Sequence, residues 1–287
     1  MIRLSPAPGL AIASLLLASL TSCASPAGHP EGATGTHSSR VLLTSQVEWE
    51  QLNPARGDQS PRAGTLWGDR TGPGPAGFLL RPVDGFESPP HIHNVAYRGV
   101  VIRGLIHNDD PQAEKMFMPT GSFWTQPAGG VHITAAKGSD CLAYIEVEDS
   151  FGVLPAAQAF TDPEVPLNVD ASNLVWLDPP GESPSSRGAK IAYLWGEQRA
   201  GALNGTLIRL PRGFKGTVRA ADSTLQAIVI DGQPTLQIEG ELGESQLEPG
   251  SYFSSKRGVV HRISNREAKA SIIYLRAEGT FDLVSTQ

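Results

Sequence analysis

Apolar and polar positions alternate along much of the chain with the period of two that is typical of β-strands. In residues 142–147, Leu142, Tyr144 and Glu146 would share one face of a strand, and the residues between them would share the other. In residues 225–230 both faces carry apolar residues, which is typical of a strand buried on both sides. No long stretch has the spacing of an amphipathic helix. The pattern predicts an all-β protein built from many short strands.

The composition agrees with this prediction. The 287 residues include 31 Gly and 23 Pro, which suits many turns between short strands. The net charge is −6 and the sequence contains no basic patch, so we do not expect it to bind nucleic acid.

The folded part of the sequence contains one pattern twice. Residues of the first copy recur 128 positions later, and farther along the offset becomes 129, because the second copy has one extra residue in a connecting loop. An offset held over this many positions indicates a structural repeat. We expect two domains, residues 41–165 and 166–287, divided at the Asp-Pro-Glu-Val-Pro run. The matched pairs include Trp67 and Trp195, Gly77 and Gly205, Arg81 and Arg209, Gly104 and Gly232, Gly121 and Gly250, and His132 and His261.

The repeat separates residues of the frame from candidates for chemistry. Features present in both copies are expected to belong to the frame, whereas His91 and His93 are matched by Arg219 and Ala221. Because a cation at position 219 would repel a metal ion, we do not expect the second copy to bind metal. Arg219 is expected to pack against the first half, with an anion pocket as the alternative. The persistence of His261 is explained equally well by a relic or by a hydrogen-bonding role.

The histidines of the first copy lie within a longer pattern of fixed spacing. Gly85 opens G-x5-H-x-H-x3-Y-x6-G, and Gly121 opens G-x5-P-x-G-x2-H, which ends at His132. This pattern resembles the two motifs of the cupin family, small β-barrels that often hold one metal ion. The resemblance implies two tandem cupin barrels of the double-stranded β-helix or jelly-roll type. Cupins usually have Glu where this chain has Tyr97.

Three histidines are predicted to meet inside the first barrel. His91 and His93 would point to one face of a strand, and His132 would join them from a distant strand. Imidazole suits Fe and Zn and, with weaker preference, Mn, and three protein ligands leave a coordination position open. We predict one divalent metal ion (Fe, Zn or Mn) on His91, His93 and His132. The alternative is a barrel that has lost its metal and keeps these histidines in polar contacts.

Tyr97 alters the charge of the predicted site. A phenol with an ordinary pKa of about 10 supplies neither the negative charge nor the oxygen ligand of Glu. The metal charge would then favour a small anionic or enolate-forming substrate. Three-histidine iron sites occur in some cupin dioxygenases. In a site of this kind Tyr97 is expected to donate a hydrogen bond to bound substrate or dioxygen. Glu87 is an alternative carboxylate, although an exposed loop position is favoured for it, and His107 is expected at the surface or the rim.

Residues 1–23 look like a lipoprotein signal peptide. Arg3 precedes an apolar run that is too short to span a bilayer well, and Leu20-Thr21-Ser22-Cys23 resembles a bacterial lipobox. The resemblance implies a lipid anchor at Cys23 that ties the protein to the membrane of the cell envelope, and Ala24 implies the outer membrane, facing the periplasm. Residues 24–40 predict a flexible tether. The alternative is an ordinary secretory signal with a chance cysteine. Cys141 is then expected to be a buried, inert thiol.

Three functions are compatible with these features. The first is a metal-dependent cupin oxidoreductase, dioxygenase-like, that acts on a small-molecule substrate. The second is a non-catalytic metal or small-molecule binding or sensor protein, because the chain also resembles an uncharacterised bicupin family related to ChrR-type anti-sigma factors. The third, an isomerase or another sugar-acting cupin, ranks last because the site lacks an acid/base pair. Association of two copies into a homodimer is left open.

Overall fold

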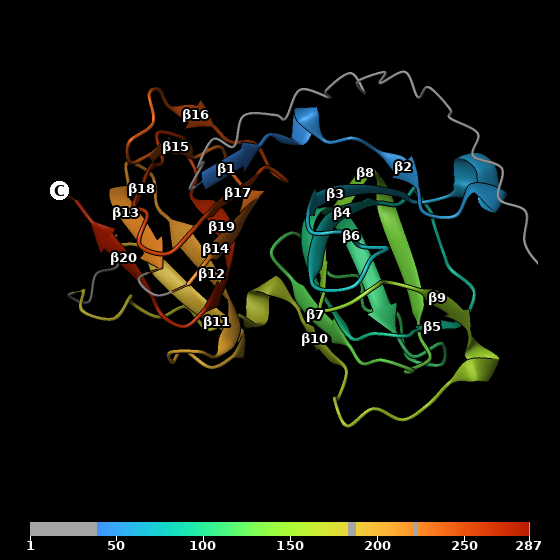
Figure 1. The fold of residues 1–287 in the computed structure, drawn as a ribbon. Helices are drawn as coiled ribbons and strands as arrows, with labels where there is room; N and C mark the ends of the chain where they lie inside the picture. Colours follow the sequence, from blue (N-terminus) through green and yellow to red (C-terminus); the bar gives the residue numbers. More distant parts are fainter. Residues whose placement is uncertain (1–38, 183–187, 221–222, 287) are drawn as a thin grey trace, which may run out of the picture. The chain divides into compact units, whose positions relative to one another are not determined.

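The structure, a computed structural model, describes residues 39–182, 188–220 and 223–286, and these form an almost entirely β protein (Figure 1). The predicted signal peptide with Cys23 and nearly all of the predicted tether lie outside the described residues. Within the described part, no helix is long and apolar enough to cross a membrane. The helical elements of these described residues are four short 3-10 turns, Thr44–Gln46, Pro54–Gln59, Ala156–Gln158 and Ala171–Asn173.

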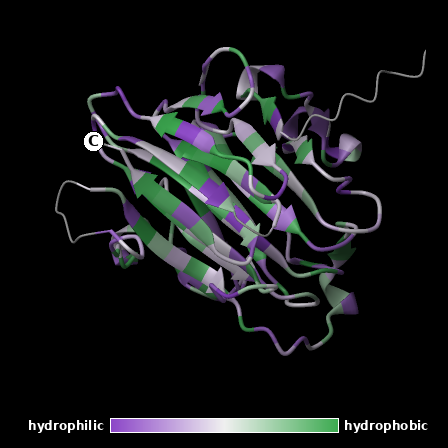
Figure 2. Ribbon diagram, turned by 60° about the vertical axis from the view of Figure 1, so that its left-hand side comes forward, coloured by the Kyte–Doolittle hydropathy of each residue, from purple (hydrophilic) through white to green (hydrophobic). Residues whose placement is uncertain are grey.

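The first half of the chain forms a large antiparallel sheet and a small one. The small sheet pairs β5 (His91–His93) with β9 (Val153–Pro155). Apolar residues lie in bands across the strands, as the alternating sequence pattern predicts (Figure 2). The large sheet has the order β10 (Leu167–Val169), β7 (Phe123–Gln126), β6 (Tyr97–Asp109), β8 (Ile133–Val147), β4 (Ala76–Arg81), β3 (Arg62–Trp67) and β2 (Glu50–Gln51).

The second half also forms two antiparallel sheets. One has the order β1 (Ser39–Leu42), β17 (Tyr252–Ser255), β14 (Leu225–Asp231), β19 (Ser271–Glu278), β12 (Leu203–Leu210) and β11 (Lys190–Gly196). The other has the order β16 (Ser245–Gln246), β15 (Thr235–Ile238), β18 (His261–Ser264), β13 (Lys215–Ala220) and β20 (Phe281–Ser285). The predicted all-β, jelly-roll fold class is confirmed by this architecture.

The two halves exchange the strands that precede them. Strand β1 comes before the first half but pairs with β17 of the second, as Figure 1 shows. Strand β10 comes before the second half but pairs with β7 of the first. Since β7 and β17 are matched by the repeat, the exchange is reciprocal. The predicted division at residues 165/166 stays a prediction, and β10 crosses it to complete the first half's sheet.

The apolar core has three parts, one of which is shared by the halves. One cluster lies within the first half and another mainly within the second. The third joins first-half residues such as Trp67 and Tyr144 to second-half residues such as Tyr252 and Tyr274. The shared cluster holds the two halves together through apolar burial, the main favourable contribution to such contacts.

Several glycines that recur in both halves occupy positions where a side chain would clash or be strained. A Cβ at Gly77 would lie 2.1 Å from Nε1 of Trp67, and one at Gly205 would lie 2.0 Å from Nε1 of Trp195. Gly104 has a φ of 74°, which an L side chain rarely adopts. A side chain would clash at Gly77 and Gly205 and would be strained at Gly104, as expected for repeated positions that belong to the frame.

Candidate metal centre

Backbone pairing places His91 beside His132. The two residues exchange N–H···O=C hydrogen bonds of 3.0 Å in both directions, although 41 positions separate them in the sequence. Their rings consequently lie side by side, with centroids 4.3 Å apart. His93 shares the face of His91 on β5, and its carbonyl accepts a hydrogen bond from the N–H of Gly129. The second motif is thereby attached to the first at two points.

The structure brings the three predicted ligands together. One ring nitrogen of each of His91, His93 and His132 lies within 4.8 Å of the others, and all three residues are buried. The ring of His93 lies 5.0 Å from that of His91 and 5.2 Å from that of His132. Among the described residues, this is the cluster of three or more His, Cys, Asp or Glu side chains that could hold a metal ion.

Each of these histidines has its Nδ1 atom beside a backbone carbonyl. Nδ1 of His91 lies 3.0 Å from the Pro89 oxygen, and Nδ1 of His93 lies 2.8 Å from the Gly152 oxygen. Nδ1 of His132 lies 3.0 Å from the Gly130 oxygen. Because a carbonyl only accepts, each Nδ1 carries the proton and each Nε2 keeps a lone pair. This arrangement orients metal-binding histidines in known sites.

Burial keeps the imidazoles neutral. The pKa of His132 is lowered to about 3, first by burial and then by the charge of neighbouring His91. Burial likewise lowers the pKa of His91, and it lowers that of His93 well below the ordinary value. Neutral imidazole is the form that binds metal, so the donor set fits a divalent cation.

Tyr97 reaches the cluster from the start of β6. Its hydroxyl oxygen lies 3.3 Å from Nε2 of His132, and its ring meets that of His93 edge-on at 5.0 Å. The hydroxyl donates its proton to Oδ1 of Asn108 at 2.7 Å. Burial raises the pKa of Tyr97, so the phenol stays protonated. The single phenol proton faces two acceptors, Oδ1 of Asn108 and Nε2 of His132, and the shorter contact, to Asn108, holds it.

A buried amide chain behind Tyr97 was not anticipated from the sequence. Asn108 accepts from Tyr97 and from Thr134 and donates to Gln126 at 3.0 Å, and Gln126 donates to the Gly130 carbonyl at 3.1 Å. That same carbonyl faces Nδ1 of His132. Asn108 and Gln126 are polar residues within strands β6 and β7, and that is the sequence signal that could have identified them.

A second supporting group lies around His93. The ring of Phe151 stacks on the His93 ring at 4.2 Å with an interplanar angle of 19°. Asn94 accepts from the N–H of Gly152 and donates to the Ser150 carbonyl, which fixes the turn that carries the Gly152 oxygen. No spacing in the sequence links residues 94 and 152, so only the fold reveals this contact.

His91 and His93 line a cavity of about 730 Å³. Its walls are mostly apolar, with Phe78, Trp124, Ile145 and Phe151 among the lining residues. Two cationic side chains line it, Arg56 and Arg70, and none of its described lining residues is Asp or Glu. The guanidinium of Arg56 lies over the ring of Phe86, and Arg70 forms an ion pair with Glu50 outside the lining.

Two other first-half residues lie outside the cluster. Glu87 is exposed and forms an ion pair with Lys115, as the favoured loop position predicts. His107 was expected at the surface or rim, and that prediction is wrong, because the residue is only 1% exposed. The segment containing Met116 and Phe117 covers it, and the Met116 carbonyl lies 3.3 Å from its Nδ1 atom.

The matched positions of the second half are arranged differently. Arg219 is half exposed and forms an ion pair with Asp282 of the neighbouring strand, rather than the expected packing against the first half. His261 is fully buried, and neither of its ring nitrogens has a hydrogen-bond partner. Burial lowers its pKa to about 4. Ala221 lies outside the described residues. Cys141 is buried, as predicted, and its thiol donates to the Lys137 carbonyl.

Comparison with known proteins gives a family and a fold. The model of one protein family, described as a domain of unknown function (DUF4437), matches residues 40–284. No curated protein matches the sequence. The solved structures that it resembles include a protein of Nostoc punctiforme provisionally assigned as a dioxygenase, with 14% identity, 87% of each chain covered and a TM-score of 0.61.

Two further similar structures belong to enzymes. Oxalate decarboxylase of Lactobacillus farciminis, in a formate complex, has 10% identity and a TM-score of 0.56 over 85% of this chain and 88% of its own. Salicylate 1,2-dioxygenase of Pseudoaminobacter salicylatoxidans, with gentisate, has 15% identity and a TM-score of 0.55 over 85% and 84%. At such identities the likeness concerns the fold alone.

Proposed function

The chain belongs to the DUF4437 family, whose function is unknown, and from this premise we propose that it binds one divalent metal ion through His91, His93 and His132 and acts as a dioxygenase-like oxidoreductase on a small anionic substrate. The observation that carries the proposal is the common orientation of the three rings. Each Nδ1 proton faces a backbone carbonyl, so three Nε2 lone pairs are left for one ion.

The donor set narrows the choice of metal. Three neutral imidazoles without a carboxylate suit Fe or Zn and are less suited to Mn, which prefers oxygen ligands. When bound, iron would supply the redox chemistry of a dioxygenase, in which both atoms of dioxygen enter the substrate. The protein's own contribution is to fix the ligands, exclude water with the apolar wall and hold the Tyr97 proton on Asn108.

The charge of the cavity supports an anionic substrate. Arg56 lines it, together with Arg70, whose charge is paired with that of Glu50, and a divalent ion on three neutral histidines would add two positive charges. The apolar walls formed by Phe78, Trp124 and Ile145 suit a substrate with a hydrophobic body. A volume of about 730 Å³ is within the range of small-molecule sites.

A second candidate function, metal or small-molecule binding without catalysis, is favoured by one observation. The proton of Tyr97 is held by Asn108, so the donor role expected for Tyr97 toward a substrate would first require that bond to break. Metal-bound protein that takes up small carboxylates without consuming dioxygen would support this candidate over the enzyme.

The resemblance of residues 20–23 to a lipobox supports a further proposal, that the protein is lipid-anchored. Acylation of Cys23 would anchor the protein in the cell envelope, in the outer membrane facing the periplasm. Mass spectrometry of the mature N-terminus would detect the lipid, and Cys23→Ser should abolish it. An unmodified Cys23 would contradict the anchor.

Elemental analysis of the purified mature chain tests the metal site. We expect one Fe, Zn or Mn per chain, its loss in His93→Ala, and retention in the matched control His261→Leu of the second half. Metal that stays bound in His93→Ala, or a wild-type protein that binds none of the three metals, would overturn the proposal. Dioxygen uptake by the ferrous form with a panel of small carboxylates then separates the enzyme from the binding protein.

A further inference from the structure

Strands β6 and β8 form a wall between the cavity and the second half. Tyr97 and Ile145 face the cavity, and the next residue of each strand, Arg98 and Glu146, faces the second half. This follows from the alternation of side chains along a strand. Arg98 lies with its guanidinium 4.1 Å from the ring centre of Trp195. The metal site and the contact between the halves are therefore one sheet apart.

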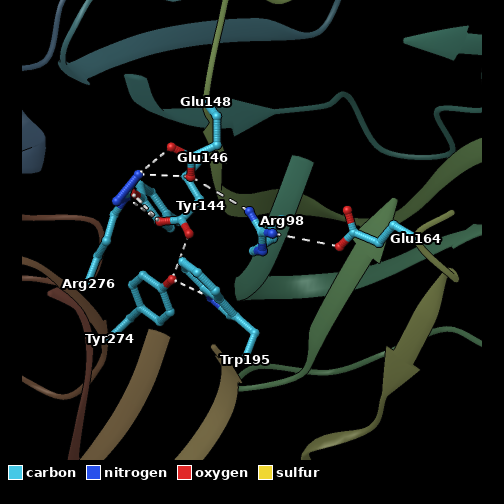
Figure 3. Close-up of polar contacts among 8 residues, drawn as sticks. All are labelled: Arg98, Tyr144, Glu146, Glu148, Glu164, Trp195, Tyr274 and Arg276. Carbon is cyan, nitrogen blue, oxygen red and sulfur yellow. Dashed lines mark hydrogen bonds and ion pairs between the residues drawn. The ribbon is translucent and has the colours of Figure 1, made fainter. Parts of the chain in front are cut away.

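A buried polar network joins the halves behind this wall (Figure 3). The hydroxyl of Tyr274 donates to Glu146 at 2.8 Å and that of Tyr144 donates at 3.1 Å. Nε of Arg276 lies 3.8 Å from Glu146, and these two side chains are 6% and 1% exposed. Removing one partner of a buried ion pair is costly, so this network fixes how the halves meet.

The network is not symmetric between the halves, because matched positions carry different residues. At the matched strands β8 and β19 the offset has grown to 130: Glu146 pairs with Gly77 as Arg276 pairs with Gly205, so Glu146 matches Arg276 and Tyr144 matches Tyr274. Arg276 donates to both carboxylate oxygens of Glu148 at 2.8 Å. The reciprocal contact would be from Glu146 to Glu278, and two carboxylates cannot form it. Each half places an arginine over a tryptophan of the other, Arg98 over Trp195 and Arg276 over Trp67, but the ion pair with a glutamate is made by Arg276 alone of the two matched positions.

Glu148 begins the segment that supports His93. Three residues later, Phe151 stacks on the His93 ring, and the Gly152 carbonyl faces its Nδ1 atom at 2.8 Å. Asn94 holds the segment at Gly152, and the Arg70 carbonyl accepts from the N–H of Phe151. At the other end, Glu148 is held by Arg276 at 2.8 Å and more loosely by Arg98 of the first half at 3.7 Å. A continuous series of contacts thus runs from the second half to a predicted ligand.

We propose that the second half acts as a positioning partner for the metal site, in which Arg276, through Glu148, holds residues 148–152 against His93. Arg276 is a positioning residue and touches neither ligand nor cavity. The inference rests on the proposed metal binding by His93. The second half, which lacks the histidine pair, would thus have a role that requires no metal site of its own.

The test uses Arg276→Gln in the full mature chain, with the exposed Arg219→Gln as the matched control. Cobalt(II) affinity is measured by titration, and exchange of the hydrogen-bonded amides of Phe151 and Gly152 is measured by mass spectrometry. We expect Arg276→Gln to weaken cobalt binding about three- to tenfold. We also expect faster exchange in residues 148–152, with neither change in the control. Glu148→Gln, at a partly exposed position, should reproduce both effects if Arg276→Gln does not fold.

Two results would overturn the inference. One is normal exchange of residues 148–152 in a folded Arg276→Gln or Glu148→Gln protein. The other is an unchanged cobalt affinity despite lower stability, which would reduce Arg276 to a purely structural role. A wild-type protein that binds no cobalt would instead contradict the proposed function, and the exchange measurement would still decide whether Arg276 holds the segment.

Discussion

The hydroxyl of Tyr97 donates a hydrogen bond of 2.7 Å to Oδ1 of Asn108. At the position where the cupin motifs that the sequence resembles usually carry Glu, this chain has a neutral group whose proton is held by an amide. The site consequently has three neutral nitrogen donors and no compensating negative charge.

Removing this hydroxyl tests whether Tyr97 is a ligand. In Tyr97→Phe, Asn108 keeps the hydrogen bond from Thr134, so we expect about 1 kcal/mol lower stability. The metal content should not change, because the three histidines keep their carbonyl partners. Denaturant unfolding and elemental analysis give the two values. Loss of the metal would show that Tyr97 binds it directly.

Asn94 should matter for metal affinity although it lies outside the ligand set. Asn94→Ala removes both hydrogen bonds that fix the turn at Gly152, whose carbonyl orients His93. We expect affinity for cobalt(II) to fall about tenfold, the lower end of the effect seen for groups that support metal ligands. Asp170→Ala, which removes a similar local cap on the exposed turn at residues 171–173, serves as control. Equal affinities in the two variants would contradict the assignment.

His261 should make the protein sensitive to acid. Its pKa is about 4 in the folded state because of burial, below the ordinary 6.5, so the unfolded chain binds the proton first as pH falls. Its contribution is fully present above pH 6.5 and is lost between pH 6.5 and 4, by up to roughly 3 kcal/mol.

The variant His261→Leu isolates this effect. Its free energy of unfolding should fall less than that of wild type between pH 7.5 and 4.5, and the difference should grow steadily below pH 6.5. Parallel pH profiles for the two proteins would show that His261 is already protonated or solvated in the folded state.

The exchanged strand β1 should stabilise the second half rather than the first. A chain that begins at residue 43 lacks the pairing of β1 with β17, whereas one that begins at residue 37 keeps it. We expect the shorter chain to lose at least about 1 kcal/mol, or roughly 2–4 °C in Tm. Amide exchange should increase in residues 252–255. A loss of protection in residues 123–126 instead would contradict the observed pairing.

The fold class and the three candidate ligands could be predicted because they depend on local signals. Alternation predicts strands, and the repeat reveals two copies of one frame. The spacing of the two motifs identifies His91, His93 and His132 as the candidate ligands. The surroundings of individual side chains could not be predicted from local signals. His107 was expected at the surface, and only the cover provided by residues 116–118 makes it a buried residue.

By itself, the sequence determined the strand pattern, the duplication and the identity of the residues that could bind a metal. These are properties of spacing, and spacing along a strand decides which side chains share a face. The tertiary structure decided which protons and charges meet: the carbonyls that face each Nδ1 atom, the Asn108 partner of Tyr97 and the contact of Arg276 with Glu148. Such contacts join residues up to 128 positions apart in the sequence. Sheet pairing and packing bring these residues together, and no local sequence pattern records which of them will meet.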